Sequence, residues 1–221
     1  MKLICPAYFA ATSSFWTFLM EQSAACEYAI CNPNSGPGAT RDLAYASVIA
    51  NAQARGISIL GYVATTYTAK GLAAVLAECK KYTDWYGVDG FFFDEVSSTP
   101  DKLPYYAQLY ATVKGVVVLN PGVYTHRAYV EVCDILCVEE RPVEVTEDRS
   151  ESLTRWMDGQ PPDKFAYFIF NVASAAKMRR VLKKARQRNV GYVYVTNDAL
   201  DNPWDTLPSY WNDMCRFVLD P

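Results

Sequence analysis

The 221-residue sequence contains a single histidine, His126, and this scarcity excludes several classes of enzyme. A Ser-His-Asp or Cys-His hydrolase would have to use that one imidazole as its base. A metal-dependent deacetylase usually needs several His and Asp ligands, which one histidine cannot supply. His126 follows Tyr124 and Thr125 in a predicted loop. We expect it to be a surface residue or to start a helix, rather than to belong to a site.

Signals for membranes, export and nucleic acid are also missing. No apolar run approaches the roughly 20 residues that a membrane-spanning helix needs. The first residues contain one lysine and a short apolar patch before Pro6, without the long apolar centre of a secretory signal. The net charge is −3, and no basic stripe indicates nucleic-acid binding. We expect a monomer with no nucleic-acid or membrane partner, located in the cytoplasm, or secreted if a leader precedes the given sequence.

The seven cysteines are odd in number and scattered, and no two of them form a CxxC pair. Zinc-ribbon and thioredoxin chemistry therefore have no support. We expect buried thiols that act as small apolar side chains in a reducing compartment. No GxGxxG motif follows the first predicted strand, so a dinucleotide site is not indicated. We expect no cofactor and no metal ion.

What the sequence does contain is a regular alternation of short β-rich runs and helix-length amphipathic segments. The strand-like runs are Leu3–Phe9, Tyr28–Cys31, Ser58–Ala64, Gly90–Phe93, Val116–Asn120, Ile135–Val138, Phe165–Phe170 and Gly191–Val195. The helical segments are Ser14–Ala25, Leu43–Arg55, Gly71–Trp85, Leu103–Val113, Ala128–Cys133, Glu144–Asp158, Ala173–Arg188 and Tyr210–Val218. Such alternation implies parallel strands joined by crossover helices. Eight units in residues 1–221 predict an α/β fold, a single-domain (β/α)8 TIM barrel. The alternative is an open, doubly wound sheet.

The chain is organised around the stretch Gly87–Val96. Its segment Gly90–Phe93 is continuously apolar, as in a strand that is buried on both faces, and it ends in two carboxylates, Asp94 and Glu95. Acidic side chains are rarely buried unless they are paired, and the C-terminal ends of barrel strands form the active face. The stretch therefore favours Asp94 and Glu95 as the chemical centre of an enzyme, although either could instead cap the next segment.

Polar and aromatic residues lie in or just after the other predicted strands. They are Tyr8, Asn32, Asn34, Tyr62, Thr66, Tyr67, Asn120, Glu139, Glu140, Asn171, Asn197 and, in the loop after the last strand, Trp204. In a barrel these strand ends converge on one rim. A cleft of carboxylates, amides and tyrosines suits a sugar, because amides hydrogen-bond hydroxyl groups and aromatic faces cover a pyranose ring. Any one asparagine could instead be a turn residue, and Trp204 could serve packing.

Glycoside hydrolysis needs two carboxyl groups that flank the scissile bond, and no metal or cofactor. Asp94 and Glu139 lie two strands apart in the predicted order, so they could face each other across the barrel mouth. Adjacent side chains on a strand point to opposite faces. Only one of Asp94 and Glu95, and only one of Glu139 and Glu140, can therefore aim over the barrel axis. The sequence leaves both choices open.

Several motifs together resemble the spherulin-4-like family, which is classed as glycoside hydrolase family 135. They are NPNSGPG (32–38), GYVATTY (61–67), WYGVDGFFFDE (85–95), the acid after the sixth strand, NPW (202–204) and LPS (207–209). The resemblance implies a (β/α)8 barrel that acts as an endo-α-1,4-N-acetylgalactosaminidase on galactosamine-containing exopolysaccharide. It also implies Asp94 as the nucleophile, Glu139 as the acid/base and Glu95 in support, with Glu140 competing for the acid/base role.

The expected function is therefore endo-acting hydrolysis of an amino-sugar polysaccharide by two carboxylates, with retention of configuration. The remaining polar and aromatic residues of the rim are expected to bind the polysaccharide. The alternative is a non-catalytic carbohydrate-binding or spore-coat protein built on the same barrel. A barrel deacetylase is a weaker third reading.

Overall fold

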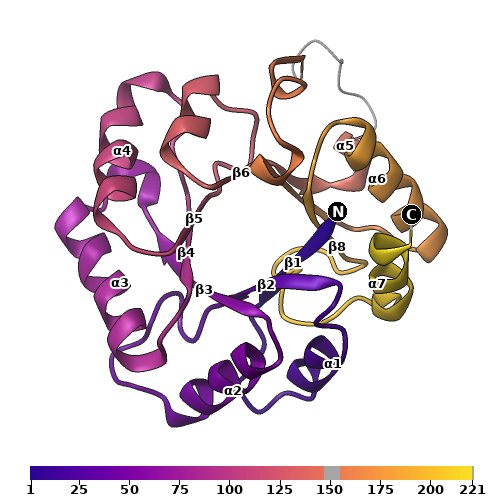
Figure 1. Cartoon of the computed structure of the whole chain (residues 1–221), viewed down its shortest axis with the longest axis horizontal. Coiled ribbons are helices and arrows are strands. Elements are labelled where there is room, and N and C mark those ends of the chain that lie inside the picture. The colour runs from indigo at the N-terminus through magenta and orange to yellow at the C-terminus, as the bar shows by residue number, and fades with distance from the viewer. Residues whose placement is uncertain (147–154, 221) are drawn as a thin grey trace.

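A computed structural model describes residues 1–146 and 155–220 of the chain. Eight parallel strands pair in sequence order, and the sheet closes because β1 pairs with both β2 and β8. The strands are β1 Lys2–Ala7, β2 Cys26–Cys31, β3 Ser58–Ala64, β4 Gly90–Asp94, β5 Val116–Leu119, β6 Ile135–Pro142, β7 Phe165–Phe170 and β8 Tyr192–Val195. Figure 1 shows the ring of strands with the helices outside it. The predicted (β/α)8 barrel is confirmed, and the open sheet is wrong.

The helices match the predicted crossover segments within a few residues at most ends. They are α1 Phe15–Glu21, α2 Leu43–Ala54, α3 Leu72–Tyr86, α4 Leu103–Thr112, α5 Val143–Thr146, α6 Ala175–Gln187 and α7 Trp211–Leu219. Between β5 and β6 the predicted short helix is a 3-10 helix, Arg127–Val132. Residues 147–154 of the predicted helix Glu144–Asp158 lie outside the described residues. Within the ranges that the structure describes, no helix is both long and apolar enough to cross a bilayer.

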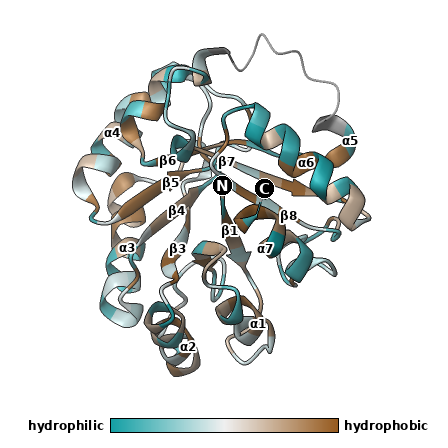
Figure 2. Ribbon diagram, turned by 45° about the vertical axis from the view of Figure 1, so that its right-hand side comes forward, coloured by the Kyte–Doolittle hydropathy of each residue, from teal (hydrophilic) through white to brown (hydrophobic). Residues whose placement is uncertain are grey.

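Helix ends follow local chemistry. The Asp42 carboxylate accepts hydrogen bonds from the backbone N–H groups of Ala44 and Tyr45 at the start of α2, which satisfies donors that have no partner inside the helix. Gly87 ends α3 in the left-handed conformation, at φ 62°, which glycine adopts without steric cost. Helix α6 turns an apolar stripe toward the barrel and a charged face outward (Figure 2). The caps fix where these helices begin and end, and the apolar stripe packs the helix against the barrel, so the strand that follows each helix enters the ring of strands.

The barrel interior is packed with side chains from alternate strand positions. All six residues of β7 are buried. Residues in the same register on neighbouring parallel strands point to the same face, and Tyr62 of β3 is in register with Phe92 of β4. The two rings stack with centroids 6.3 Å apart, and Phe92 meets Phe168 of β7 from across the barrel at 5.7 Å. This aromatic layer closes the interior below the C-terminal mouth.

Strand β6 differs most from the prediction, because it continues to Pro142 instead of ending at Val138. Its pairing with β7 shifts between Cys137 and Glu139, so that Glu139 pairs with Tyr167 and Glu140 with Phe168. This is a β-bulge, in which one strand carries an extra residue. The bulge turns Glu140 to the inner face with Phe168. Strict alternation from Cys137, which pairs with Ala166, would instead have put Glu139 inside.

Candidate active site

Asp94 is the last residue of β4 and points into the mouth of the barrel. Its Oδ2 accepts a hydrogen bond from the Tyr62 hydroxyl at 2.8 Å, and its Oδ1 accepts one from Asn120 Nδ2 at 2.9 Å. The backbone N–H of Glu95 is a third donor. Burial raises the pKa of Asp94 above its ordinary value of 3.8, and the three donors oppose that rise because they favour the ionised form. Asp94 is therefore held in one orientation at the mouth.

Glu140 is the second carboxyl at the mouth. Its Oε2 accepts a hydrogen bond from the same Asn120 Nδ2, and the Trp204 side chain donates another. Burial, followed by the charge of Asp94, raises the pKa of Glu140 from 4.5 to about 7. At neutral pH a large share of Glu140 is therefore protonated. The two carboxyls differ in environment, which is how paired acids acquire different protonation states.

Asn120 joins these two acids. It follows β5, is 3% exposed, and uses one nitrogen to donate to a carboxylate of β4 and to a carboxylate of β6. The nearer oxygens of Asp94 and Glu140 are therefore no more than two hydrogen-bond lengths apart. The Asn120 Oδ1 accepts from the Gly122 N–H at 3.0 Å, so the amide is also tied to its own turn.

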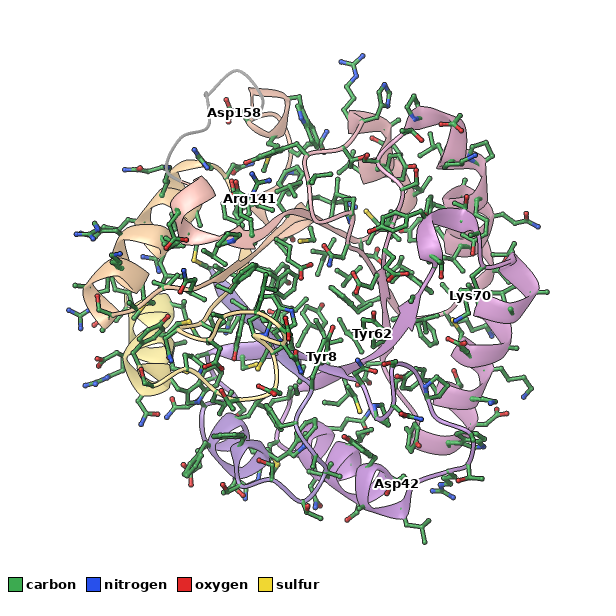
Figure 3. All side chains as sticks on the ribbon, turned by 180° about the vertical axis from the view of Figure 1, so that it is seen from behind. Tyr8, Asp42, Tyr62, Lys70, Arg141 and Asp158 are labelled. Carbon is green, nitrogen blue, oxygen red and sulfur yellow. The ribbon has the colours of Figure 1, made fainter. Side chains whose placement is uncertain are left out.

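Aromatic side chains surround the carboxyl pair. Tyr8 and Tyr62 meet edge to face with ring centroids 5.5 Å apart, and both lie toward the middle of the ring in Figure 3. Burial, followed by the charge of Asp94, raises the pKa of both tyrosines above 10, so their hydroxyls stay protonated at neutral pH. Trp204 is 8% exposed and packs against Phe168 at 6.0 Å. Its indole therefore serves packing as well as the hydrogen bond to Glu140.

A cavity of about 50 Å³ lies between these groups. Its lining is Pro6, Tyr8, Phe92, Asp94, Asn120, Glu140, Phe168 and Trp204. Pockets that enclose whole ligands are usually about 300 Å³ or larger. The cavity is therefore too small to enclose a whole ligand.

Glu139 does not reach this mouth, and the predicted pairing of Asp94 with Glu139 is wrong. Its side chain is 0% exposed and lies on the outer face of β6. There Glu139 forms ion pairs with Arg141 Nε at 3.2 Å and with Arg188 Nη1 at 3.8 Å. In Figure 3, Arg141 lies well away from Tyr8 and Tyr62. The β-bulge in β6 explains why Glu140, and not Glu139, lies on the inner face of the strand.

Glu95 lies beside Asp94, at the point where the chain leaves β4. It has φ 52°, so the strand alternation stops there. Its carbonyl accepts from the Tyr67 N–H at 2.7 Å and from Thr65 Oγ1 at 2.8 Å. Thr66 and Tyr67 also have positive φ, and the Tyr67 side chain is 62% exposed. The loop after β3 is thus bound to the carboxylate dipeptide and presents an exposed aromatic ring.

Four predicted asparagines lie outside the lining of the cavity. The Asn32 side chain accepts from the Gly36 N–H at 2.8 Å, and the Asn197 side chain accepts from the Ser209 N–H at 2.7 Å. The exposed Asn171 donates to Glu144 at 3.0 Å. The remaining one, Asn34, is also exposed and lies outside the cavity lining.

Three residues of the cavity were not predicted. They are Pro6, Phe92 and Phe168. Phe92 lies two residues before Asp94, so strand periodicity places the two on the same face. Phe168 lies on the same face as Glu140 because the two residues pair across β6 and β7. The sequence does not reveal that pairing. His126 is exposed, and its Nδ1 accepts the Ala128 N–H at the start of the 3-10 helix, as expected.

Solved structures with this architecture include several carbohydrate-active proteins. Sph3 from Aspergillus clavatus, solved in complex with GalNAc, superposes with a TM-score of 0.86 at 22% identity, over 98% of this chain and 96% of that one. A chitinase from Rhizomucor miehei, RmChi1, gives 0.63 at 11% identity, over 98% and 99%. The glycoside hydrolase domain of PelA from Pseudomonas aeruginosa gives 0.56 at 11% identity, over 92% and 98%. At these identities the likeness establishes the shared barrel.

Sequence comparison gives the family. Spherulin-4 from Physarum polycephalum is 28% identical over 198 residues, which is 82% of this chain and 59% of that protein, so the chain spans less than two thirds of its relative. The model of spherulation-specific family 4 matches residues 2–218. With the barrel and the motifs at its mouth, this match confirms the resemblance: the chain belongs to spherulation-specific family 4.

Proposed function

We propose that this chain is a glycoside hydrolase that cleaves α-1,4-linked N-acetylgalactosamine- or galactosamine-containing polysaccharide at internal bonds. One observation carries the proposal: Asp94 and Glu140 approach each other through one amide at the C-terminal mouth of the barrel. This is the position at which TIM-barrel enzymes place their chemistry. The Sph3 complex with GalNAc, a structure with the same barrel, supports the choice of amino sugar.

The spacing of the acids supports a retaining mechanism. Retaining glycosidases hold their carboxyls about 5–5.5 Å apart, whereas inverting enzymes leave roughly 6.5–9.5 Å for a water molecule. Two hydrogen bonds to a single nitrogen are too short for the inverting arrangement. Asp94 attacks the anomeric carbon while Glu140 gives its proton to the departing glycosidic oxygen. Glu140 then takes a proton from water, whose oxygen displaces Asp94 from the sugar.

The protonation states suit these roles. A general acid must carry its proton at working pH, and the raised pKa of Glu140, about 7, provides it. A nucleophile must be ionised, and three hydrogen-bond donors favour the charged form of Asp94. The backbone N–H of Glu95 favours the ionised form of Asp94, whereas the charge of the Glu95 side chain opposes it. Its negative charge also adds to the acidic character of the mouth.

Aromatic residues provide the surfaces on which sugar rings pack. Tyr8 and Tyr62 stand beside the carboxyls, and Tyr67 is an exposed ring on the loop bound to Glu95. A flat aromatic face covers the apolar face of a pyranose. A platform outside the cavity fits an enzyme that binds several sugars of a polymer. Thr66, next to Tyr67, is exposed on the same loop and can hydrogen-bond the sugar hydroxyls.

The test is the release of reducing ends from purified galactosaminogalactan by the wild type and by Asp94→Asn. We expect release by the wild type and a loss of about 10³-fold or more in Asp94→Asn, because the nucleophile is removed while the shape is kept. Both proteins should bind the polymer. Binding by the wild type without any release of reducing ends would overturn the proposal and favour a carbohydrate-binding protein.

A further inference from the structure

We propose that Asn120 is a positioning residue, which sets the separation and orientation of Asp94 and Glu140, and that it is not a ligand of the sugar. The inference rests on the proposed function, because it concerns how the catalytic pair is held. Its basis is the bridge from one nitrogen to both carboxylates. It replaces the sequence-based expectation that Asn120 binds substrate.

The side-chain amide of Asn120 is already occupied. An amide NH2 group has two hydrogens to donate, and here one goes to Asp94 and the other to Glu140. The carbonyl oxygen accepts from the Gly122 N–H. The residue is only 3% exposed, so a sugar hydroxyl could reach it only by displacing one of the carboxylates.

The backbone holds Asn120 between the two strands that carry the acids. On the β4 side, its N–H donates to the Phe93 carbonyl at 2.8 Å, one residue before Asp94. On the β6 side, the Glu140 N–H donates to the Gly122 carbonyl at 3.1 Å. The turn Asn120-Pro121-Gly122 therefore contacts both carboxylate strands through main-chain bonds. A short turn containing proline has little freedom, which suits a residue that must fix a distance.

The electrostatic reason for the bridge is the repulsion between two acids that lie close together. The groups that face the pair are Tyr8 after β1, Tyr62 from β3, Glu95 after β4, Cys137 from β6 and Trp204 from the last loop. None of these carries a positive charge. Asn120 alone among them donates to both acids, and it favours the ionised form of each. Without its amide, the ionised pair loses its common donor.

The test follows the carboxyl titrations by NMR with ¹³C-labelled Asp and Glu, in the wild type, Asn120→Ala and Tyr62→Phe. Loss of the bridge should raise the titration midpoint of Glu140 by about one pH unit or more. Tyr62→Phe is the matched control, because it removes a donor to Asp94 alone and should leave the Glu140 midpoint in place. An unchanged Glu140 midpoint in Asn120→Ala would overturn the inference. Asn120→Leu is similar in size, carries no charge and cannot donate, so it gives the same test if Asn120→Ala does not fold.

Kinetics separate this inference from the proposed function. If Asn120 positions the acids, Asn120→Ala lowers kcat by about 10²-fold, leaves KM nearly unchanged and moves the alkaline limb of the pH profile upward. A raised KM with an unchanged kcat would instead indicate that Asn120 binds the sugar. The proposed hydrolase function would then stand. If the wild type shows no hydrolase activity but Asn120→Ala still moves the Glu140 midpoint, the proposed function is wrong and the positioning role of Asn120 stands.

Discussion

Glu139 and Glu140 are neighbours in the sequence, yet the fold gives them opposite surroundings. Glu139 is buried between arginines outside the barrel, and Glu140 lies at the mouth beside Asp94. A buried acid with paired charges is a structural element, since removing one partner leaves an uncompensated charge. A half-buried acid with a raised pKa beside a second acid is suited to proton transfer. The two glutamates thus show that residue type alone does not define a site.

The pH dependence of activity should follow these two acids. The value of kcat/KM should fall as pH rises through about 7, because Glu140 then loses the proton that it must donate. The acidic limb should lie above 3.8, because burial raises the pKa of Asp94. Initial rates of reducing-end release across pH 3–9 measure both limbs. A rate that is constant between pH 6 and 9 would contradict the assignment of Glu140.

Stability should change with pH at the same residue. The folded-state pKa of Glu140, about 7, lies above its ordinary 4.5, so its contribution to stability is complete below 4.5 and is lost as pH rises through 7. Glu140→Gln, a neutral mimic, should therefore raise the free energy of unfolding at pH 8 by about 3 kcal/mol and hardly change it at pH 4. Urea unfolding at both pH values measures this, and exposed Glu131→Gln is the control. Equal effects at pH 4 and pH 8 would count against the shifted pKa.

At the scale of elements, the sequence predicted where the strands lie but did not predict their local geometry. The bounds predicted for β3 and β7 agree with the structure, because both are continuous β-rich runs. Strand β6 was predicted too short, because its last residues include charges that normally end a strand. Here Glu139 and Arg141 are buried as a pair on the outer face. The bulge that selects Glu140 arises from pairing with β7, which is a tertiary contact.

Glycine at the start of β4 is needed for the close approach of the next strand. A Cβ at Gly90 would lie 2.2 Å from the Val116 carbonyl oxygen, which is backbone and cannot move aside cheaply. Gly90→Ala should therefore destabilise the protein by about 3 kcal/mol, at the upper end of overpacking costs. Gly71→Ala is the matched control, because nothing lies within 4 Å of its added Cβ. Equal thermal stability of the two variants would show that β4 and β5 can separate without cost.

For the whole molecule, the fold class followed from the sequence because eight alternating units leave few other architectures. The site followed only in part. The strand-end rule brought Tyr8, Asp94 and Glu140 to one rim, but it also collected asparagines that only shape loops, such as Asn197. Post-strand asparagines have two uses, and only the three-dimensional contacts separate them.

The net charge of −3 gives a prediction for the whole molecule. A partly deacetylated, cationic polysaccharide should be attracted to the protein over a long range. Raising the ionic strength from about 0.01 to 0.15 M shortens the Debye length from about 30 to 8 Å. The value of kcat/KM on that substrate should then fall, by up to about tenfold. A fully N-acetylated polymer is the control, and an equal fall on both substrates would exclude long-range attraction as the cause.

The most direct measurement is the turnover number of Glu140→Gln beside that of Glu139→Gln on the same galactosaminogalactan. Glu140→Gln should lose about 10²–10⁴-fold in kcat, because the amide cannot donate the proton that the leaving oxygen needs. Glu139→Gln should be less stable, since the neutral side chain leaves Arg141 and Arg188 without their buried anion. Its folded fraction should keep a wild-type kcat. Full activity in Glu140→Gln, with a loss in folded Glu139→Gln, would contradict the assignment of Asp94 and Glu140 as the catalytic pair.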